Sequence, residues 1–205
     1  MHHAHKSGHR NNGTVIGDSL TYVSRGAYKL DSVAAKLNLH FKGKTVLDVG
    51  ASTGGFSDYA LKHGAIKVIA VDKGTKQINP LLATDPALEI HEKTDIRDFK
   101  PEKAPDLILA DVSFMSLTEI LPAIAQLANA DTEIIVLAKP QFETRDVVLK
   151  HKGVIKNERI RRQILSGLEM WFKRSFVIKA KADSGIVGTH GNKERFYLLK
   201  LKQIT

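Results

Sequence analysis

Cysteine is absent from this chain of 205 residues, and its absence excludes several kinds of chemistry. Without thiols there is no disulfide framework, no cysteine nucleophile and no cysteine-ligated zinc or iron–sulfur centre. Long apolar runs are also missing, since runs such as residues 134–138 are far too short to cross a bilayer. The polar, histidine-rich N-terminus has no apolar core and is not typical of a signal peptide. We therefore expect a cytoplasmic protein without integral membrane association.

Acidic residues are in deficit, with 22 Asp and Glu against 31 Lys and Arg, which gives a formal net charge of +9. An excess of this size favours a polyanionic partner, nucleic acid first and an anionic membrane surface second. Net charge alone leaves a merely basic protein equally open.

The N-terminal residues 1–20 lack hydrophobic periodicity, which predicts a flexible tail ahead of one domain over residues 21–205. The tail carries His2, His3, His5 and His9. A cloning remnant or a disordered tail explains these histidines better than a metal site, so we assign no metal.

The rest of the chain alternates helical and strand patterns. Helical spacing covers residues 25–39, and further helices are predicted at 55–63, 116–128 and 157–173. Short apolar runs predict strands at 45–49, 67–71, 88–91, 107–112, 133–138, 176–182 and 195–201. Their mostly continuous apolar character favours an α/β fold, a parallel sheet with helices on both faces. The last two runs are too close for a helical crossover, which predicts an antiparallel hairpin.

A glycine-rich turn, DVGASTGGF at residues 48–56, follows the first strand and opens a helix. Small residues there let backbone N–H groups approach a polar or anionic ligand. The middle position is Ser52, so the turn is not the G-x-G-x-x-G of dinucleotide folds, and because no Lys-Ser or Lys-Thr pair follows, it is not a P-loop either. Asp48, just before the turn, suits a cationic ligand such as a sulfonium cofactor with its amino-acid end.

Acidic residues also follow the next two strands. Asp72 can accept both hydroxyls of a ribose, and Asp95 can take the exocyclic amine of adenine. Singly, loop glycines and helix caps explain each feature. In this order they predict an S-adenosylmethionine pocket formed by Asp48, Gly50, Ala51, Ser52, Gly54, Gly55, Phe56, Asp72, Lys73, Asp95, Ile96 and Asp111.

Five stretches, the glycine-rich turn among them, are informative together: YVSRGAYKL, DVGASTGGF, ADVSFMSL, AKPQFE and GNKERF. In this order they resemble the hemolysin A (TlyA-type) group of FtsJ-like RNA methyltransferases. The resemblance implies a Rossmann-like class I methyltransferase sheet of order 3-2-1-4-5-7-6 with strand 7 antiparallel. It also implies ribose 2′-O-methylation of RNA, with ribosomal RNA or ribosomal subunits as partners.

The resemblance further implies a Lys-Asp-Lys-Glu catalytic set of Lys29, Asp111, Lys139 and Glu194. A lysine serves as general base only when its pKa falls, which burial and a neighbouring cation both promote. Lys139 is then the base and Lys29 the second cation, while Asp111 orients Lys139 and Glu194 compensates Lys29. From the strand pattern alone, Lys139 could instead be an exposed strand end and Asp111 a helix cap.

Plainer interpretations stay open for the other two residues. Periodicity alone places Lys29 with Lys36 at the edge of a solvated helix face. Glu194 could pair at the surface with Lys193 or Arg195.

Several features bear on RNA binding. Basic residues on or before the last helix could track phosphates, or form a solvated helix face: Lys152, Lys156, Arg159, Arg161, Arg162, Lys173 and Arg174. Phe114 or Phe142 could stack on a base or on the cofactor, although core packing or loop anchoring is the plainer interpretation. Members of the resembled group carry an N-terminal S4-type RNA-binding domain, and we expect this chain to lack it. The alternatives are a methyltransferase for another substrate, a membrane-lytic hemolysin and a catalytically weak RNA-binding scaffold.

Overall fold

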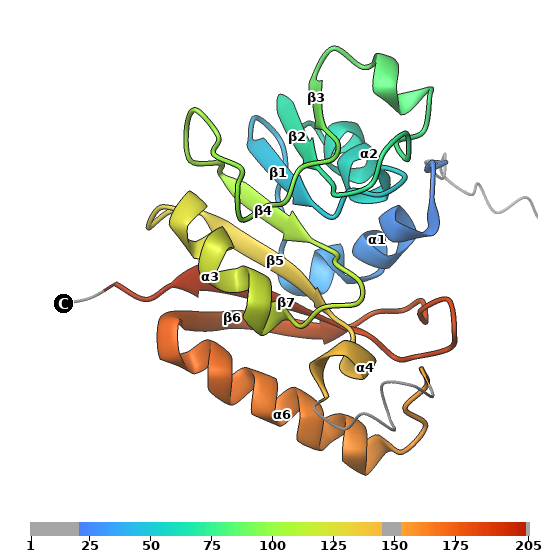
Figure 1. Ribbon diagram of the computed structural model, residues 1–205, viewed down its shortest axis with the longest axis vertical. Helices are drawn as coiled ribbons and strands as arrows, with labels where there is room; N and C mark the ends of the chain where they lie inside the picture. Colours follow the sequence, from blue (N-terminus) through green and yellow to red (C-terminus); the bar gives the residue numbers. More distant parts are fainter. Residues whose placement is uncertain (1–20, 145–152, 204–205) are drawn as a thin grey trace, which may run out of the picture.

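The protein is described by a computed structural model that covers residues 21–144 and 153–203. Its centre is one seven-stranded sheet, of strand order β3-β2-β1-β4-β5-β7-β6 (Figure 1). The strands are β1 Thr45–Val49, β2 Lys67–Val71, β3 Leu88–His91, β4 Leu107–Ala110, β5 Glu133–Ala138, β6 Phe176–Asp183 and β7 Arg195–Leu201. Only β7 among them runs antiparallel, against both β5 and β6. The predicted order and the predicted antiparallel hairpin are therefore confirmed.

Helices cover both faces of this sheet because successive residues of a strand point to opposite sides. On one face, α1 (Arg25–Leu37) and α2 (Gly55–Lys62) pack over residues such as Val46 and Leu109. On the other, α3 (Leu117–Leu127) and α6 (Glu158–Ser175) pack over residues such as Ile108 and Ile134. The sheet is thus buried on both faces, which explains why its strands read as continuous apolar runs.

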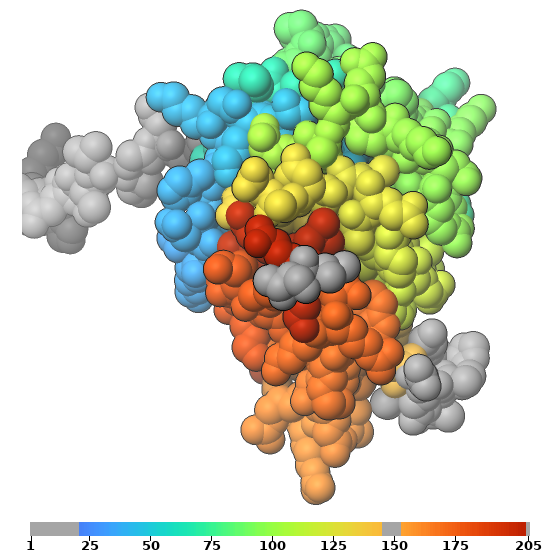
Figure 2. Space-filling view, turned by 90° about the vertical axis from the view of Figure 1, so that its left-hand side faces the viewer, coloured from blue at the N-terminus to red at the C-terminus, as the bar shows by residue number. Residues whose placement is uncertain are grey.

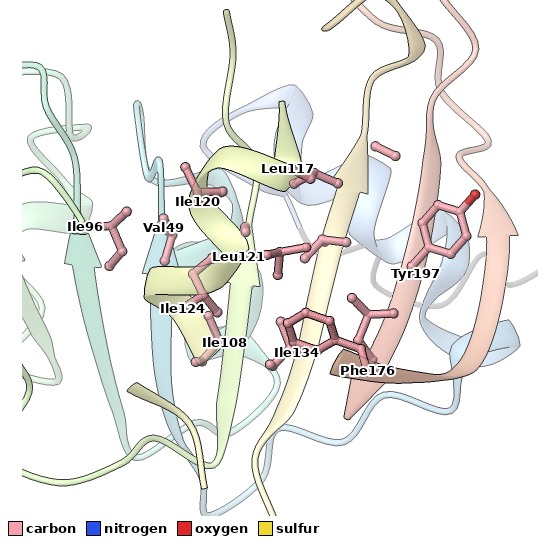
Figure 3. Close-up of a cluster of buried hydrophobic side chains, with 14 of the residues drawn as sticks. Val49, Ile96, Ile108, Leu117, Ile120, Leu121, Ile124, Ile134, Phe176 and Tyr197 are labelled. Atoms are coloured by element: carbon pink, nitrogen blue, oxygen red, sulfur yellow. The ribbon is translucent and has the colours of Figure 1, made fainter. Parts of the chain in front are cut away.

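The α3 face shows how the core is assembled. Ile120, Leu121 and Ile124 point from α3 onto Ile108 and Ile134 of the sheet (Figure 3). Leu121 is fully buried. Truncating such a leucine to alanine typically costs about 2–5 kcal/mol, because the packing closes only partly over the cavity.

The element ends differ from the prediction at a few places. β4 stops at Ala110, two residues earlier than expected, and the Asp111 N–H still donates to the Val49 carbonyl at 3.1 Å. The short helices α4 (Pro140–Glu143) and η1 (Leu82–Thr84) were not predicted, because so few residues show no periodicity. Within the described residues, no helix combines the length and the apolar character needed to span a bilayer.

The parallel strands all point to one side of the molecule in Figure 1, and the loops that carry the predicted site residues lie there. Figure 2 looks onto the opposite side, where the parallel strands begin. In open α/β sheets, ligand sites gather outside the carboxyl ends of the strands, so the first of these sides is where a site is expected.

Candidate active site

Glycines bring three chain segments together at the carboxyl end of β1. Gly50 has a φ of +78°, and a Cβ there would lie 2.7 Å from the backbone oxygen of Asp111. A Cβ on Gly55 would lie 2.2 Å from Ser24 Oγ, next to the start of α1. The glycine-rich turn therefore lets the loop after β1 touch both the loop after β4 and the start of α1.

A cleft of about 350 Å³ opens beside this turn, between the loops that follow β1, β2, β3 and β4. Among the residues predicted to bind a cofactor, those lining it are Gly50, Ser52, Asp72, Lys73, Asp95, Ile96 and Asp111. Asp72 joins two of the loops, since its Oδ2 accepts the Ser52 N–H at 2.8 Å and its Oδ1 the Gly74 N–H at 2.6 Å. Ser52 holds a left-handed φ of 49°, which is costly for a residue other than glycine and points to a constrained loop.

Asp95 is more heavily engaged than the sequence suggested. Its carboxylate accepts two hydrogen bonds from the Arg97 guanidinium, at 2.9 and 2.6 Å, and lies 2.9 Å from Lys73 Nζ. The hydrogen bonds from Arg97, followed by that from Lys73, hold the pKa of Asp95 well below its ordinary value. Asp95 is thus a fixed carboxylate at the edge of the cleft, and its contact with an adenine amine stays a prediction.

Asp48, the last residue but one of β1, is almost completely buried. Its Oδ2 accepts the Ser57 hydroxyl at 2.6 Å, while Oδ1 has no hydrogen-bond partner among the described residues. Burial raises the pKa of Asp48 to about 7, although the Ser57 hydrogen bond opposes the rise. A buried carboxylate oxygen without a donor fits a cationic group of a ligand, which is the chemistry predicted for the amino-acid end of the cofactor.

A second cleft, of about 360 Å³, adjoins the first. The two share Gly50, Ser52, Asp111 and Ser113 as lining residues. Lys29, Asp48 and Lys139 line the second cleft as well. A ligand in the first cleft therefore lies next to two lysines in the second.

Four side chains from distant parts of the sequence meet here as two ion pairs. Lys29 Nζ lies 2.7 Å from Glu194 Oε2, and Lys139 Nζ lies 2.6 Å from Asp111 Oδ1. Both lysine side chains are 10% exposed and that of Glu194 is 3% exposed, so these are not loose surface pairs. The structure thus brings together the four residues that the motifs singled out.

The plainer interpretations of these residues are wrong in three respects. Lys29 is buried, so the solvated helix face suggested by periodicity applies to the exposed Lys36 only. Lys139 is not an exposed strand end but 8% exposed at the start of α4. Glu194 does not pair with Lys193 or Arg195 at the surface but with Lys29, since Lys193 pairs with Glu158 and Arg195 pairs with Asp183.

Asp111 is not the helix cap either, because Ser116 caps α3. Its side chain accepts from the Thr118 N–H, and Glu119 completes a capping box. Glu143 adds hydrogen bonds to Ser116 and to the Leu117 N–H, at 2.6 and 3.0 Å. The last residue of the AKPQFE motif therefore fixes α4 to the start of α3.

The loop between β6 and β7 is fastened to α1, a set of contacts that the sequence did not reveal. Arg25 Nη2 donates to the Val187 carbonyl at 2.9 Å, and Ser32 Oγ accepts the Gly185 N–H at 2.9 Å. Gly188 packs against Glu194, and a Cβ there would lie 2.4 Å from the carboxylate. Because Lys29 lies between Arg25 and Ser32 on the same helix, these contacts hold the Lys29–Glu194 pair in place.

A contact of Lys139 was also missed. Its Nζ donates to Ser113 Oγ at 2.8 Å, in addition to its ion pair with Asp111. Ser113 stands in the ADVSF motif two residues after Asp111, so its position in that motif was the available signal.

The basic residues near α6 divide into two groups. Arg161 is buried, donating to Asp183 at 2.7 Å and to the Lys193 carbonyl at 3.0 Å, so both interpretations, a phosphate contact and a solvated helix face, are wrong for it. The exposed members are Lys156, Arg159, Arg162, Lys173 and Arg174, whereas Lys152 and the histidines of residues 1–20 lie outside the described residues.

Phe114 differs from the expected core aromatic. Its side chain is 91% exposed, so core packing is the wrong interpretation for this residue. It has a left-handed φ of 68°, lines the first cleft, and lies with its ring centroid 5.4 Å from that of the half-buried Phe142. An exposed ring on a strained backbone at a cleft suits a flat ligand.

Comparison with known proteins agrees with this geometry. The family model for FtsJ-like methyltransferases matches residues 22–201. A 23S rRNA (cytidine-2′-O)-methyltransferase TlyA from Campylobacter jejuni is 39% identical over 178 residues, which cover 86% of this chain and 70% of that protein. A 16S/23S rRNA (cytidine-2′-O)-methyltransferase TlyA from Mycobacterium tuberculosis is 36% identical over 91% of this chain and 72% of its own length.

A solved structure from Streptococcus thermophilus, which carries a provisional hemolysin name, superposes with a TM-score of 0.84 at 35% identity. The match covers 91% of this chain and 70% of that one.

Proposed function

Because this chain belongs to the FtsJ-like methyltransferase family, we propose that it transfers the methyl group of S-adenosylmethionine to a ribose 2′-hydroxyl of ribosomal RNA. The observation that carries the proposal is that two buried lysines, each paired with a carboxylate, line a cleft that adjoins a second cleft. The relatives from Campylobacter jejuni and Mycobacterium tuberculosis are named for cytidine in ribosomal RNA, which supports the same substrate class here.

Residues of the first cleft, together with Asp48 of the second, suit the parts of this cofactor. Asp72 uses its two oxygens to accept backbone N–H groups, and a carboxylate has further lone pairs that can accept the ribose hydroxyls. The unpartnered Oδ1 of Asp48 would hold the ammonium group of the amino-acid end. Asp95 and Ile96 would lie along the adenine. S-adenosylmethionine supplies an activated methyl group on a sulfonium, so the protein need not activate it further.

The residues of the second cleft would act on the nucleophile. A ribose 2′-hydroxyl attacks well only as it loses its proton, and Lys139 Nζ would accept that proton. Asp111 holds Nζ at 2.6 Å and so fixes where the base lies. Lys29, held by Glu194, would place a positive charge beside the oxygen as negative charge develops on it. The substrate oxygen would therefore lie between two positioned nitrogens.

Binding of RNA would use the surface around these clefts. The exposed ring of Phe114 offers a platform for an unstacked base, and the exposed basic side chains of α6 offer contacts for phosphates. Ribosomal subunits in the cytoplasm are the proposed site of action.

The test is methyl transfer from radiolabelled S-adenosylmethionine to ribosomal RNA, free and in ribosomal subunits. Lys139→Ala should lower the rate at least about 100-fold, since it removes the general base. Lys36→Ala is the matched control, because this exposed lysine on α1 has the same charge and faces away from the site. Equal rates for Lys139→Ala and wild type would overturn the proposed role of Lys139.

A further inference from the structure

The amine of Lys139 has a second partner besides Asp111. Its Nζ lies 2.6 Å from Asp111 Oδ1 and 2.8 Å from Ser113 Oγ, and both oxygens can accept a hydrogen bond. Ser113 lines both clefts and therefore stands where the cofactor side and the lysine side of the site meet. Asp111 and Ser113 come from one loop, the one that follows β4.

The number of these acceptors matters for a general base. A neutral amine has two N–H bonds and one lone pair around nitrogen, besides its bond to carbon. One acceptor would fix one N–H but would leave the lone pair free to occupy either of the two remaining positions. Two acceptors take both N–H bonds, so the lone pair must occupy the last position. Lys139 lines the second cleft, so that position is available to a substrate there.

We propose that Ser113 is a positioning residue that, together with Asp111, directs the Lys139 lone pair at the ribose 2′-hydroxyl. The inference rests on the proposed function and adds a residue to it. As the hydroxyl proton moves to Nζ, the lone pair becomes the third N–H bond of an ammonium, while the contacts to Asp111 and Ser113 stay in place. Ser113 acts through Lys139, not on the substrate itself.

This role separates Ser113 from a residue that merely shapes the cleft. Loss of its hydroxyl would leave the ion pair with Asp111, and so the place of Nζ, intact. Only the orientation of the lone pair would no longer be fixed. The effect should therefore appear in the chemical step and spare the binding of both substrates.

The experiment compares Ser113→Ala and Ser113→Thr with wild type in the methyl-transfer assay, with S-adenosylmethionine affinity measured by calorimetry. Ser113→Ala should lower kcat about tenfold, the usual effect of one hydrogen bond, with KM for RNA and Kd for the cofactor within about twofold. Ser113→Thr keeps the hydroxyl and should retain most of kcat. Ser166→Ala, an exposed serine on α6, is the control for the substitution itself. An unchanged melting temperature would show that Ser113→Ala folds normally, as expected for an exposed side chain.

Three outcomes would overturn the inference: a wild-type kcat for Ser113→Ala, a Ser113→Thr as slow as the alanine variant, or a loss confined to cofactor affinity. Each of these outcomes is interpreted only if the wild-type protein methylates RNA and the Lys139→Ala variant does not. The proposed function would therefore still hold when the role of Ser113 is overturned. A wild-type protein without methyl transfer would instead overturn the proposed function itself.

Discussion

Replacing Asp48 by asparagine should stabilise the fold at high pH while weakening the site. Burial raises the pKa of Asp48 from an ordinary value of 3.8 to about 7. Folding therefore favours the protonated carboxyl, and the free energy of unfolding falls as the pH rises between about 4 and 7. The full loss amounts to about 4 kcal/mol, at 1.36 kcal/mol for each unit of pKa.

An asparagine does not titrate, so the difference between the two proteins should depend on pH. Between pH 5 and pH 8 the titration of Asp48 should lower the free energy of unfolding of wild type by roughly 2–3 kcal/mol, a decrease that the Asp48→Asn variant should not show. Urea denaturation of both proteins at the two pH values measures this change, and the pH 5 comparison serves as the internal control. Any constant offset from the new amide group cancels.

The same substitution removes the negative charge proposed to hold the cofactor ammonium. Calorimetry at pH 8 should therefore show S-adenosylmethionine binding at least about tenfold more weakly to Asp48→Asn, in keeping with the strength of a charge-assisted hydrogen bond. A stability difference that is equal at pH 5 and pH 8 would refute the raised pKa. Unchanged cofactor affinity would refute the assignment of Asp48 to the ammonium.

Two further predictions concern buried charges. Glu194→Gln leaves Lys29 buried without its counter-charge, so urea denaturation should show a loss of about 3–5 kcal/mol in the free energy of unfolding, and methyl transfer should fall sharply. The double variant Lys29→Met with Glu194→Leu should recover stability but not activity. Wild-type activity in the double variant would contradict a catalytic role for both residues. Arg161→Met should lower the free energy of unfolding by about 1–3 kcal/mol but leave RNA affinity intact. Arg162→Met, at an exposed position, should leave stability intact but weaken RNA binding and reduce its salt dependence by about one charge. A loss of RNA affinity in Arg161→Met alone would contradict the structural role of Arg161.

The strands of the sheet could be predicted from the sequence because each one is a short, local run of apolar residues. Runs such as residues 133–138 are apolar throughout, and a sheet covered on both faces requires that. The spacing between the last two strands was enough to make β6 and β7 a hairpin. The strand order itself came from the motifs, since periodicity does not say which strands are neighbours.

Burial of individual charged residues could not be predicted in this way. Lys29 and Lys36 occupy similar places in the helical pattern, yet only Lys29 is buried, because Glu194 meets it from 165 positions along the chain. Arg161 looks like one more exposed charge of α6 until Asp183 of β6 is placed beside it. Such partners are set by tertiary contacts, which a single sequence does not display.

The exposure of Phe114 could not be predicted for a related reason. Phe114 follows a strand and reads as an anchor for its loop, whereas the backbone there turns into the left-handed region and exposes the ring. A positive φ at a bulky residue has no signal in the sequence, because the conformation is imposed by the surrounding loops.

The central claim is that the methyl group goes to the ribose oxygen, and the nature of the modified nucleoside tests it most directly. Ribosomal RNA or subunits treated with wild-type protein and S-adenosylmethionine would be digested to nucleosides and separated by mass spectrometry. The account predicts a 2′-O-methylated nucleoside, cytidine by analogy with the relatives, that is absent after treatment with Lys139→Ala. A methyl group found on a base, or a product formed equally by Lys139→Ala, would contradict it.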